Sequence, residues 1–318
     1  MKRFFFTLFI FILPIVISSC SKKVENSLIY EDTTFGLSIT GVSKQTKNLV
    51  IPNTATFNGT EKKIVSIKDQ AFLNDQTLET IAFSSNIKSI GIESFKGCTS
   101  LNNIDFPDSL TSIGISAFEN NTSITKVYFP SSLRDISISS FEGCTNLKQI
   151  TFQNGNERIM DDAFKGCSSL VSIYGASNIQ NIMSGAFQDC TSLYNLDLGF
   201  GLLTLGPKVF YNCINLAHII IPSRVTSIQE STFSGCYNLI SCKLPYELTS
   251  IEKEAFMGCV SLEKLYISKN IKYISNSTFL DCNKEKTQIY LEVSSEVAST
   301  FPNNWNNNLT VIYNYESD

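Results

Sequence analysis

The stretch SFKGCTSLNNIDFPDSLTSIGISAF, residues 94–118, begins and ends on nearly the same residues. Its first phenylalanine, Phe95, returns as Phe118 after 23 residues, and Cys98 follows Phe95 by three positions. The same interval, without an insertion, separates Phe72, Phe95, Phe118, Phe141, Phe164, Phe187, Phe210, Phe233, Phe256 and Phe279. Self-similarity at a fixed period of this length is typical of solenoids, in which each repeat forms one turn of a coil. One such turn is called a rung below.

Other positions of the repeat are as regular as the phenylalanine. An apolar residue stands six, nine and eighteen positions after almost every Phe, as Leu101, Ile104 and Ile113 do after Phe95. A 23-residue unit cannot bury these side chains alone, so successive rungs must stack and share one core. An inserted residue would turn inward positions outward, and this explains the constant period.

The local pattern predicts what each rung contains. The residues nine and eleven positions after the Phe are both apolar, and this alternation predicts a short strand. A proline, which cannot continue a ladder, often ends it, as at Pro107 and Pro245. The residues just before the Phe, such as KEAF at 253–256, favour a compact helical turn on the opposite side. Stacked at ~4.8 Å, about ten rungs would form a parallel sheet ~45–50 Å long.

Eight of the ten cysteines occupy the position three after the Phe, and Asn121 and Asp75 replace them in two rungs. Cysteine is a compact hydrophobe with a weak S–H donor, which suits a small buried position. Stacked rungs would hold equivalent side chains ~4.8 Å apart and parallel, whereas a disulfide needs converging Cβ atoms ~3.8 Å apart. We therefore expect free thiols, with a disulfide framework as the alternative in an exported protein. Zinc is disfavoured because the chain has no Cys-x-x-Cys pair and one histidine.

The first twenty residues are a separate unit. Lys2 and Arg3 precede an apolar run over 4–17, which is too short for a membrane span of ~20 residues but suits a signal peptide. The following Ser-Ser-Cys20 completes a sequence that resembles the lipobox of bacterial lipoproteins, which implies cleavage before Cys20 and its acylation. An ordinary secretory signal with an incidental cysteine is the alternative. We expect a signal peptide over 1–19 and a lipidated tether over 20–27.

The repeat F-x-G-C-x-x-L-x-x-I-x-F-P-x-x-L-x-x-I-x-x-x-A-F resembles the BspA-like leucine-rich repeats of bacterial surface proteins, over roughly residues 64–285. The expected fold is an α/β repeat: a leucine-rich-repeat solenoid of about ten 23-residue rungs with a parallel β-sheet face. A right-handed parallel β-helix is the physical alternative. Residues 28–63 are predicted to form a β-rich N-terminal cap, and residues 286–318 an irregular C-terminal cap in which Trp305 covers the last rung. Asn156, Gly175 and Cys242 depart from the pattern and are expected to loosen the packing locally.

Motifs for catalysis are missing from the sequence. It contains no phosphate-binding glycine loop, no His-Glu-x-x-His and no Gly-x-Ser-x-Gly. His218, the one histidine, falls on an outward strand position without a predicted orienting partner. The net charge of −4 and the pI near 5.3 provide no basic field for nucleic acid. We therefore predict no catalytic residue, metal or cofactor, and no nucleic-acid partner.

The outward positions of the strands remain as a candidate binding surface, eight and ten residues after each Phe. In alternate rungs the tenth position holds a large side chain, in a row spaced ~10 Å apart. Tyrosine favours exposed strands, but it is also enriched among binding anchors. The candidate partner-binding residues are Lys126, Tyr128, Tyr174, Asp197, His218, Ile220, Lys243, Lys264 and Tyr266.

The resemblance implies an exported protein that binds host extracellular proteins or mediates adhesion between cells. We accordingly predict a non-enzymatic bacterial lipoprotein of the cell envelope, at the outer membrane or cell surface, that meets the membrane only through its N-terminal lipid. Its expected partner is a protein, either a host matrix component or another cell surface. A carbohydrate-binding or uptake accessory lipoprotein, with tyrosines stacked on sugar rings, is the alternative, and an enzyme the third.

Overall fold

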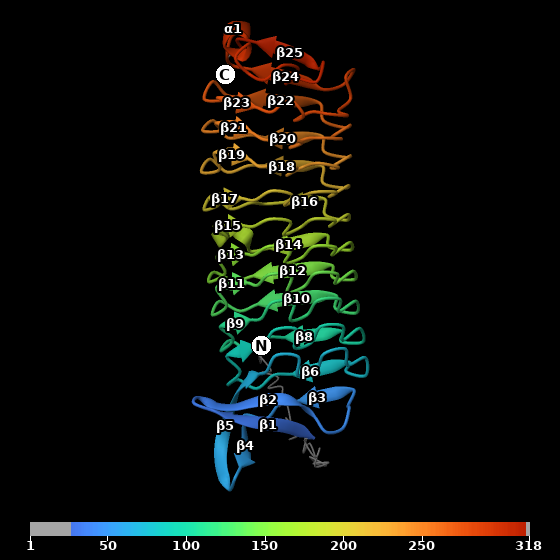
Figure 1. The fold of residues 1–318 in the computed structure, drawn as a ribbon, viewed down its shortest axis with the longest axis vertical. Coiled ribbons are helices and arrows are strands. Elements are labelled where there is room, and N and C mark those ends of the chain that lie inside the picture. Colours follow the sequence, from blue (N-terminus) through green and yellow to red (C-terminus); the bar gives the residue numbers. More distant parts are fainter. Residues whose placement is uncertain (1–26, 316–318) are drawn as a thin grey trace, which may run out of the picture.

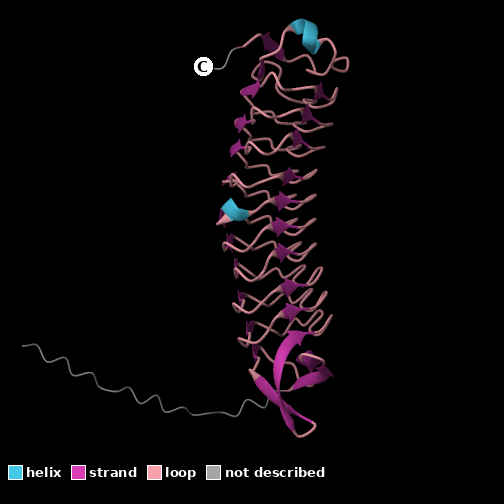
Figure 2. Ribbon diagram, turned by 90° about the vertical axis from the view of Figure 1, so that its left-hand side faces the viewer, coloured by secondary structure: helices cyan, strands magenta, loops and turns pink. Residues whose placement is uncertain are grey.

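The computed structural model describes residues 27–315, which coil into a long, nearly straight parallel β-solenoid (Figure 1). The chain climbs from the N-terminal strands at the bottom to the C-terminal strands at the top. Most rungs contribute one strand to each of two sheets, and Figure 2 shows that loops join these strands on every side. The coil makes about twelve turns rather than the ten predicted, because residues outside the regular repeat also add turns.

The first sheet, which forms the right-hand column of Figure 1, is parallel throughout and hydrogen-bonded in two halves that meet between β14 and β16. Its strands are β3 (Asn48–Val50), β6 (Thr80–Ala82), β8 (Asn103–Asp105), β10 (Lys126–Phe129), β12 (Gln149–Phe152), β14 (Ser172–Tyr174), β16 (Asn195–Leu196), β18 (His218–Ile220), β20 (Ser241–Lys243), β22 (Lys264–Ile267), β24 (Gln288–Leu291) and β25 (Thr310–Tyr313). The strands β3, β24 and β25 come from the two stretches expected to be caps, so these stretches continue the sheet.

The second sheet consists of two-residue strands and the longer strands at the N-terminal end. Its strands are β1 (Leu28–Thr33), β2 (Gly36–Val42), β4 (Thr54–Phe57), β5 (Thr60–Ile67), β7 (Ser89–Ile90), β9 (Ser112–Ile113), β11 (Asp135–Ile136), β13 (Arg158–Ile159), β15 (Asn181–Ile182), β17 (Thr204–Leu205), β19 (Ser227–Ile228), β21 (Ser250–Ile251) and β23 (Tyr273–Ile274). Only β1 and β4 pair antiparallel, with β2 and β5. The registers Val127↔Ile150 and Ile136↔Ile159 show the 23-residue period in both sheets.

The third side of each rung is a turn, and the predicted helical component of the α/β assignment is wrong. Within the described residues, helix is limited to α1 (Ser295–Ala298) and the 3₁₀ turn η1 (Ala176–Asn178). Around Phe95 the backbone is left-handed at Glu93 (φ 51°) and Gly97 (φ 72°), which breaks a helix on both sides. The Phe95 N–H donates to Ala117 O of the next rung at 2.8 Å, so this side too is joined from rung to rung.

Phenylalanine recurs because its rings form one continuous stack in the core. All nine successive pairs are stacked, with ring centroids 5.0 to 6.0 Å apart, from Phe72–Phe95 to Phe256–Phe279. A second, shorter row of Phe83, Phe106, Phe129 and Phe152 borders it, in which the last three rings are stacked. Aromatic rings bury more apolar area than other side chains, so this column carries much of the shared core.

The repeated cysteines are buried free thiols, as predicted. Each donates its S–H to the carbonyl of the Phe 26 residues earlier, as Cys144 Sγ does to Phe118 O at 3.2 Å. Asn121 Nδ2 makes the same bond to Phe95 O at 2.9 Å. The repeat position therefore requires a small donor, and both residue types supply one. Burial raises the pKa of Cys98 and of Cys144 to about 12.

Two of the three departures from the pattern do not loosen the packing. Asn156 is fully buried, and its Nδ2 donates to Pro130 O and Leu133 O while its Oδ1 accepts the Gln153 N–H at 2.7 Å. Cys242 is buried in an aliphatic position. Gly175 has a φ of 73° and leads into η1, next to the break between β14 and β16, so of the three departures it alone coincides with an interruption of the first sheet. The second sheet is interrupted elsewhere, between β9 and β11 and between β17 and β19.

Candidate binding surface

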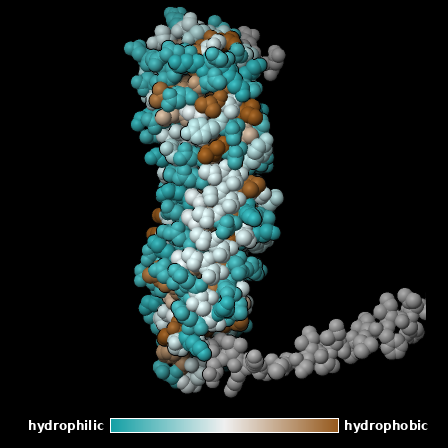
Figure 3. All heavy atoms as spheres, turned by 90° about the vertical axis from the view of Figure 1, so that its right-hand side faces the viewer, coloured by the Kyte–Doolittle hydropathy of each residue, from teal (hydrophilic) through white to brown (hydrophobic). Residues whose placement is uncertain are grey.

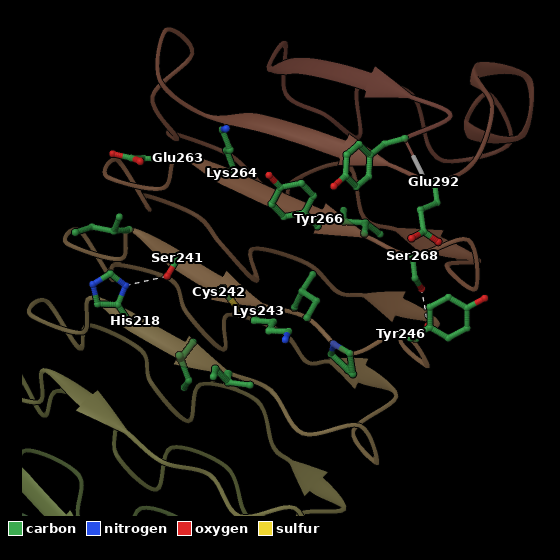
Figure 4. A pocket seen from close by; sticks show the side chains of 17 residues that line it. His218, Ser241, Cys242, Lys243, Tyr246, Glu263, Lys264, Tyr266, Ser268 and Glu292 are labelled. Atoms are coloured by element: carbon green, nitrogen blue, oxygen red, sulfur yellow. Dashed lines mark hydrogen bonds between the residues drawn. The ribbon is translucent and has the colours of Figure 1, made fainter. Parts of the chain in front are cut away.

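A concavity of about 820 Å³ lies on the outer face of the first sheet, over β18, β20 and β22 (Figure 4). We call it the C-terminal groove. Its floor follows from strand alternation, since inward residues such as Ile219 enter the core while their neighbours point outward. These outward residues are His218, Ile220, Ser241, Lys243, Lys264 and Tyr266.

Aromatic side chains form the walls of the groove. Tyr266 packs against Tyr290 of β24 and against Tyr315, with ring centroids 4.8 and 5.2 Å apart. On the opposite side Tyr246 follows β20, and the Lys269 ammonium lies 5.9 Å from its ring centroid. Figure 4 shows Tyr246 beyond Ser268 and Glu292, at the ends of the strands, so the groove is closed by aromatic rings at two borders.

Two lysines of the groove, Lys243 and Lys264, have no counterion within the described residues. No carboxylate of residues 27–315 lies within 4.0 Å of Lys243 or Lys264, although the Lys264 ammonium lies 5.7 Å from the Tyr290 ring centroid. The acids already have partners: Glu263 pairs with Lys286 at 3.3 Å, and Glu292 Oε2 accepts the Lys269 N–H at 2.9 Å. In a chain with a net charge of −4, Lys243 and Lys264 are thus two cations without a counterion within 4.0 Å in the described residues.

His218 does not form a catalytic arrangement. Its Nδ1 lies 2.8 Å from Ser241 Oγ, and its ring meets Tyr194 edge-on. A working triad needs an acid that orients the imidazole, and no carboxylate of the described chain bonds to His218. No group of His, Cys, Asp or Glu within 27–315 could hold a metal ion. None of the helices in this range is long and apolar enough to cross a membrane.

Of the nine predicted surface residues, the structure brings five together. His218, Ile220, Lys243, Lys264 and Tyr266 line the groove. The other four are exposed on the same sheet nearer the N-terminus, outside the groove, and are Lys126, Tyr128, Tyr174 and Asp197. The sheet break between β14 and β16 separates Lys126, Tyr128 and Tyr174 from it, whereas Asp197 follows β16, on the groove's side of the break. The predicted lipidation residue, Cys20, lies outside the described residues.

Sequence reasoning missed the walls of the groove. Tyr246 lies in the loop after Pro245, beyond the strand positions that were considered. Tyr315, which lines the groove, and Tyr290, against which Tyr266 packs, fall where the 23-residue period has ended. The only sequence signal for them is the number of aromatics in a stretch that was expected to be a cap.

The edge beside the groove changes character along the solenoid. Four positions after the Phe, the early rungs carry Thr, Ser or Gln, whereas the later rungs expose Ile214, Tyr237 and Val260. This edge faces the viewer in Figure 3, where the middle is pale and brown apolar side chains gather in the upper part. The C-terminal half is therefore the more apolar part of this surface.

Comparison with known protein families agrees with the repeat. The family model described as "BspA type Leucine rich repeat region" matches residues 65–194 and 159–286, in six copies. The chain belongs to this family. No curated protein matches the sequence.

Solved structures of bacterial repeat proteins are similar to the chain at low identity. A leucine rich cell surface protein from Faecalibacterium prausnitzii is 20% identical, with 86% of this chain and 95% of that one covered and a TM-score of 0.40. A leucine-rich repeat protein from Bacteroides ovatus is 20% identical, with 91% of this chain and 98% of that chain covered and a TM-score of 0.40. The pneumococcal vaccine antigen PcpA is 16% identical, with 92% of this chain and 98% of that chain covered and a TM-score of 0.48.

Proposed function

We propose that this member of the BspA-type family is a non-enzymatic binding protein of a bacterial envelope, and that its first sheet recognises a protein partner. The observation that carries the proposal is the C-terminal groove, where outward residues of three strands meet two aromatic walls. Tyrosine and exposed aliphatic side chains are typical anchors of protein interfaces. The partner is a host extracellular matrix component or a protein on another cell.

The scaffold supports this function because it is rigid. The side chains project from parallel strands that are hydrogen-bonded to both neighbours, so little backbone must be ordered on binding. Tyr266 is further held by contacts with two other rings. Such preorganised residues lose little conformational entropy in a complex.

The N-terminal residues support the proposed location at the cell envelope. Lipid on Cys20 would anchor the chain, and residues 20–27 would connect it to β1 at the N-terminal end of the solenoid. The groove lies near the other end, close to β24 and β25 (Figure 1). An anchored molecule would thus hold its binding surface far from its own membrane.

The test is direct binding of purified residues 20–318 to two panels on the same instrument. One panel holds immobilised extracellular-matrix and cell-surface proteins, and the other is a glycan array. Saturable binding to a protein, unchanged after enzymatic removal of its glycans, supports the proposal. Binding to glycans alone overturns it in favour of a carbohydrate-binding or uptake accessory lipoprotein, for which the cluster of Tyr266, Tyr290 and Tyr315 offers a stacking platform.

A further inference from the structure

We propose that the C-terminal groove binds an extended peptide segment in which a bulky apolar side chain is flanked by carboxylates. The inference rests on the proposed function and adds the chemistry of the partner. Two features of the groove carry it, its cations and its apolar floor.

The cations favour an anionic partner. Lys243 and Lys264 project from neighbouring strands, and neither has a carboxylate of the described chain within 4.0 Å. The two acids at the border are engaged by Lys286 and by the Lys269 N–H. A carboxylate entering the groove therefore meets two cations without displacing an intramolecular partner. Such charge complementarity steers association and selects partners.

The apolar residues favour a peptide over a sugar. Lys243 is flanked by Ile220, its register partner in β18, and by Tyr266, which holds the same repeat position in the next rung. Leu244 and Ile267 also line the groove. A sugar needs many free hydrogen-bonding groups, yet the two hydroxyls nearest the floor are engaged, Ser241 with His218 and Ser268 with Tyr246 O.

The size of the groove also suits a peptide segment. A volume of about 820 Å³ exceeds one side chain and lies in the upper part of the range for binding pockets, ~300–1,000 Å³. Its lining reaches His218 and Ile240 at the beginnings of the strands, so a chain can continue on that side toward the exposed Tyr237 and Val260 on the neighbouring edge. An apolar side chain would then lie between Ile220 and Tyr266, with its neighbouring carboxylates at the two lysines.

The experiment screens a displayed library of random 12-residue peptides against residues 20–318. We expect the enriched peptides to combine Asp or Glu with Phe, Tyr, Trp or Leu. The affinity of one such synthetic peptide should fall at least about tenfold in the K243Q/K264Q variant, and with rising salt, because two charge pairs are lost. The matched control is K126Q, since Lys126 holds the same repeat position as Lys264 on β10, outside the groove.

Three results would overturn the inference: no enriched peptide, enrichment without acidic residues, or binding that survives in K243Q/K264Q. Lysine-dependent binding of glucuronic acid oligosaccharides in place of peptides would also overturn it. These failures are distinct from failure of the proposed function. A protein partner that binds the wild type and K243Q/K264Q equally well would leave the function standing and remove only the acidic-peptide chemistry.

Discussion

Cysteine and asparagine alternate at one repeat position because both place a small donor against the same carbonyl. Cys190 Sγ donates to Phe164 O at 3.3 Å, and Asn121 Nδ2 replaces this bond in its own rung. The sequence predicted a small buried residue here, since periodicity reveals which positions point inward. It could not predict the bond itself, because the acceptor is defined by how the turn folds back on the preceding rung.

Substitutions at Cys190 should separate the contribution of its hydrogen-bond donor to stability from the contribution of its small size. Cys190→Ala removes the S–H bond to Phe164 O, which keeps its bond from the Cys167 N–H, and should lower the free energy of unfolding by about 1 kcal/mol. Cys190→Lys places an unpaired charge in the dry core and should cost considerably more. Urea unfolding measures both. Thiol counting in denaturant without reductant is the companion assay, and a result in which fewer than half of the thiols react would contradict the free-thiol structure.

Alkaline pH should destabilise the solenoid through these thiols. Burial raises the pKa of Cys98 and of Cys144 from about 9 to about 12, so above pH 9 the unfolded chain releases protons that the folded chain keeps. Stability is thus complete below pH 9 and falls as pH rises, by about 1.4 kcal/mol per pH unit for each thiol. Urea unfolding at pH 8 and pH 10 should show a smaller pH effect in Cys144→Ala, and an unchanged pH effect would contradict this account.

At the level of elements, the strands were predictable and the turns were not. The alternation around Ile104 and Ile150 identified the first-sheet strands, because strand burial has a period of two. The expected helical turn was wrong because left-handed residues such as Glu93 cannot be recognised from composition. The strands β24 and β25 were missed because they pair through backbone atoms, which need no repeat pattern in the side chains.

The recurring glycine of the turn should be intolerant of a side chain. Gly143 has a φ of 72°, and a Cβ there would lie 2.2 Å from Asn120 Oδ1. Gly143→Ala should therefore lower the free energy of unfolding by at least about 1 kcal/mol. Gly201→Ala is the matched control, since its Cβ would meet nothing closer than 3.7 Å, and it should change stability by less than about 0.5 kcal/mol. Equal effects in chemical denaturation would refute the proposed role of the left-handed turn.

At the level of the molecule, the long solenoid separates a predicted anchor from a predicted binding surface. The outward residues of the strands were predictable, because strand alternation defines them. Their convergence into a groove was not, since it depends on Tyr246 in a loop and Tyr315 after the last strand. The position of the sheet break at Gly175, which divides the row of tyrosines, also required the structure.

The predicted lipid anchor at Cys20 can be tested independently of partner binding. Cys20→Ala should abolish labelling of the chain by a fatty-acid analogue in the producing bacterium and leave the precursor uncleaved at this site. The reason is that the cysteine is both the residue after the expected cleavage point and the acylated group. Intact-mass analysis of the wild type is the decisive readout. An unmodified Cys20, or a mature chain that begins elsewhere, would rule out the lipoprotein assignment.

The central claim is that a protein partner binds the exposed face of the first sheet, and its most direct measurement is the partner affinity of the Y128A/Y174A/Y266A variant. Tyr128 and Tyr174 are exposed, so the free energy of unfolding should change by only about 0.5 kcal/mol for each; Tyr266 also packs against two rings and should cost about 1 kcal/mol. Binding should weaken by about 1–2 kcal/mol at each true anchor. The control, K96A/K165A, alters the turn beside the Phe stack and should bind like the wild type. Unchanged affinity in the tyrosine variant, with loss of binding in the control, would contradict the account.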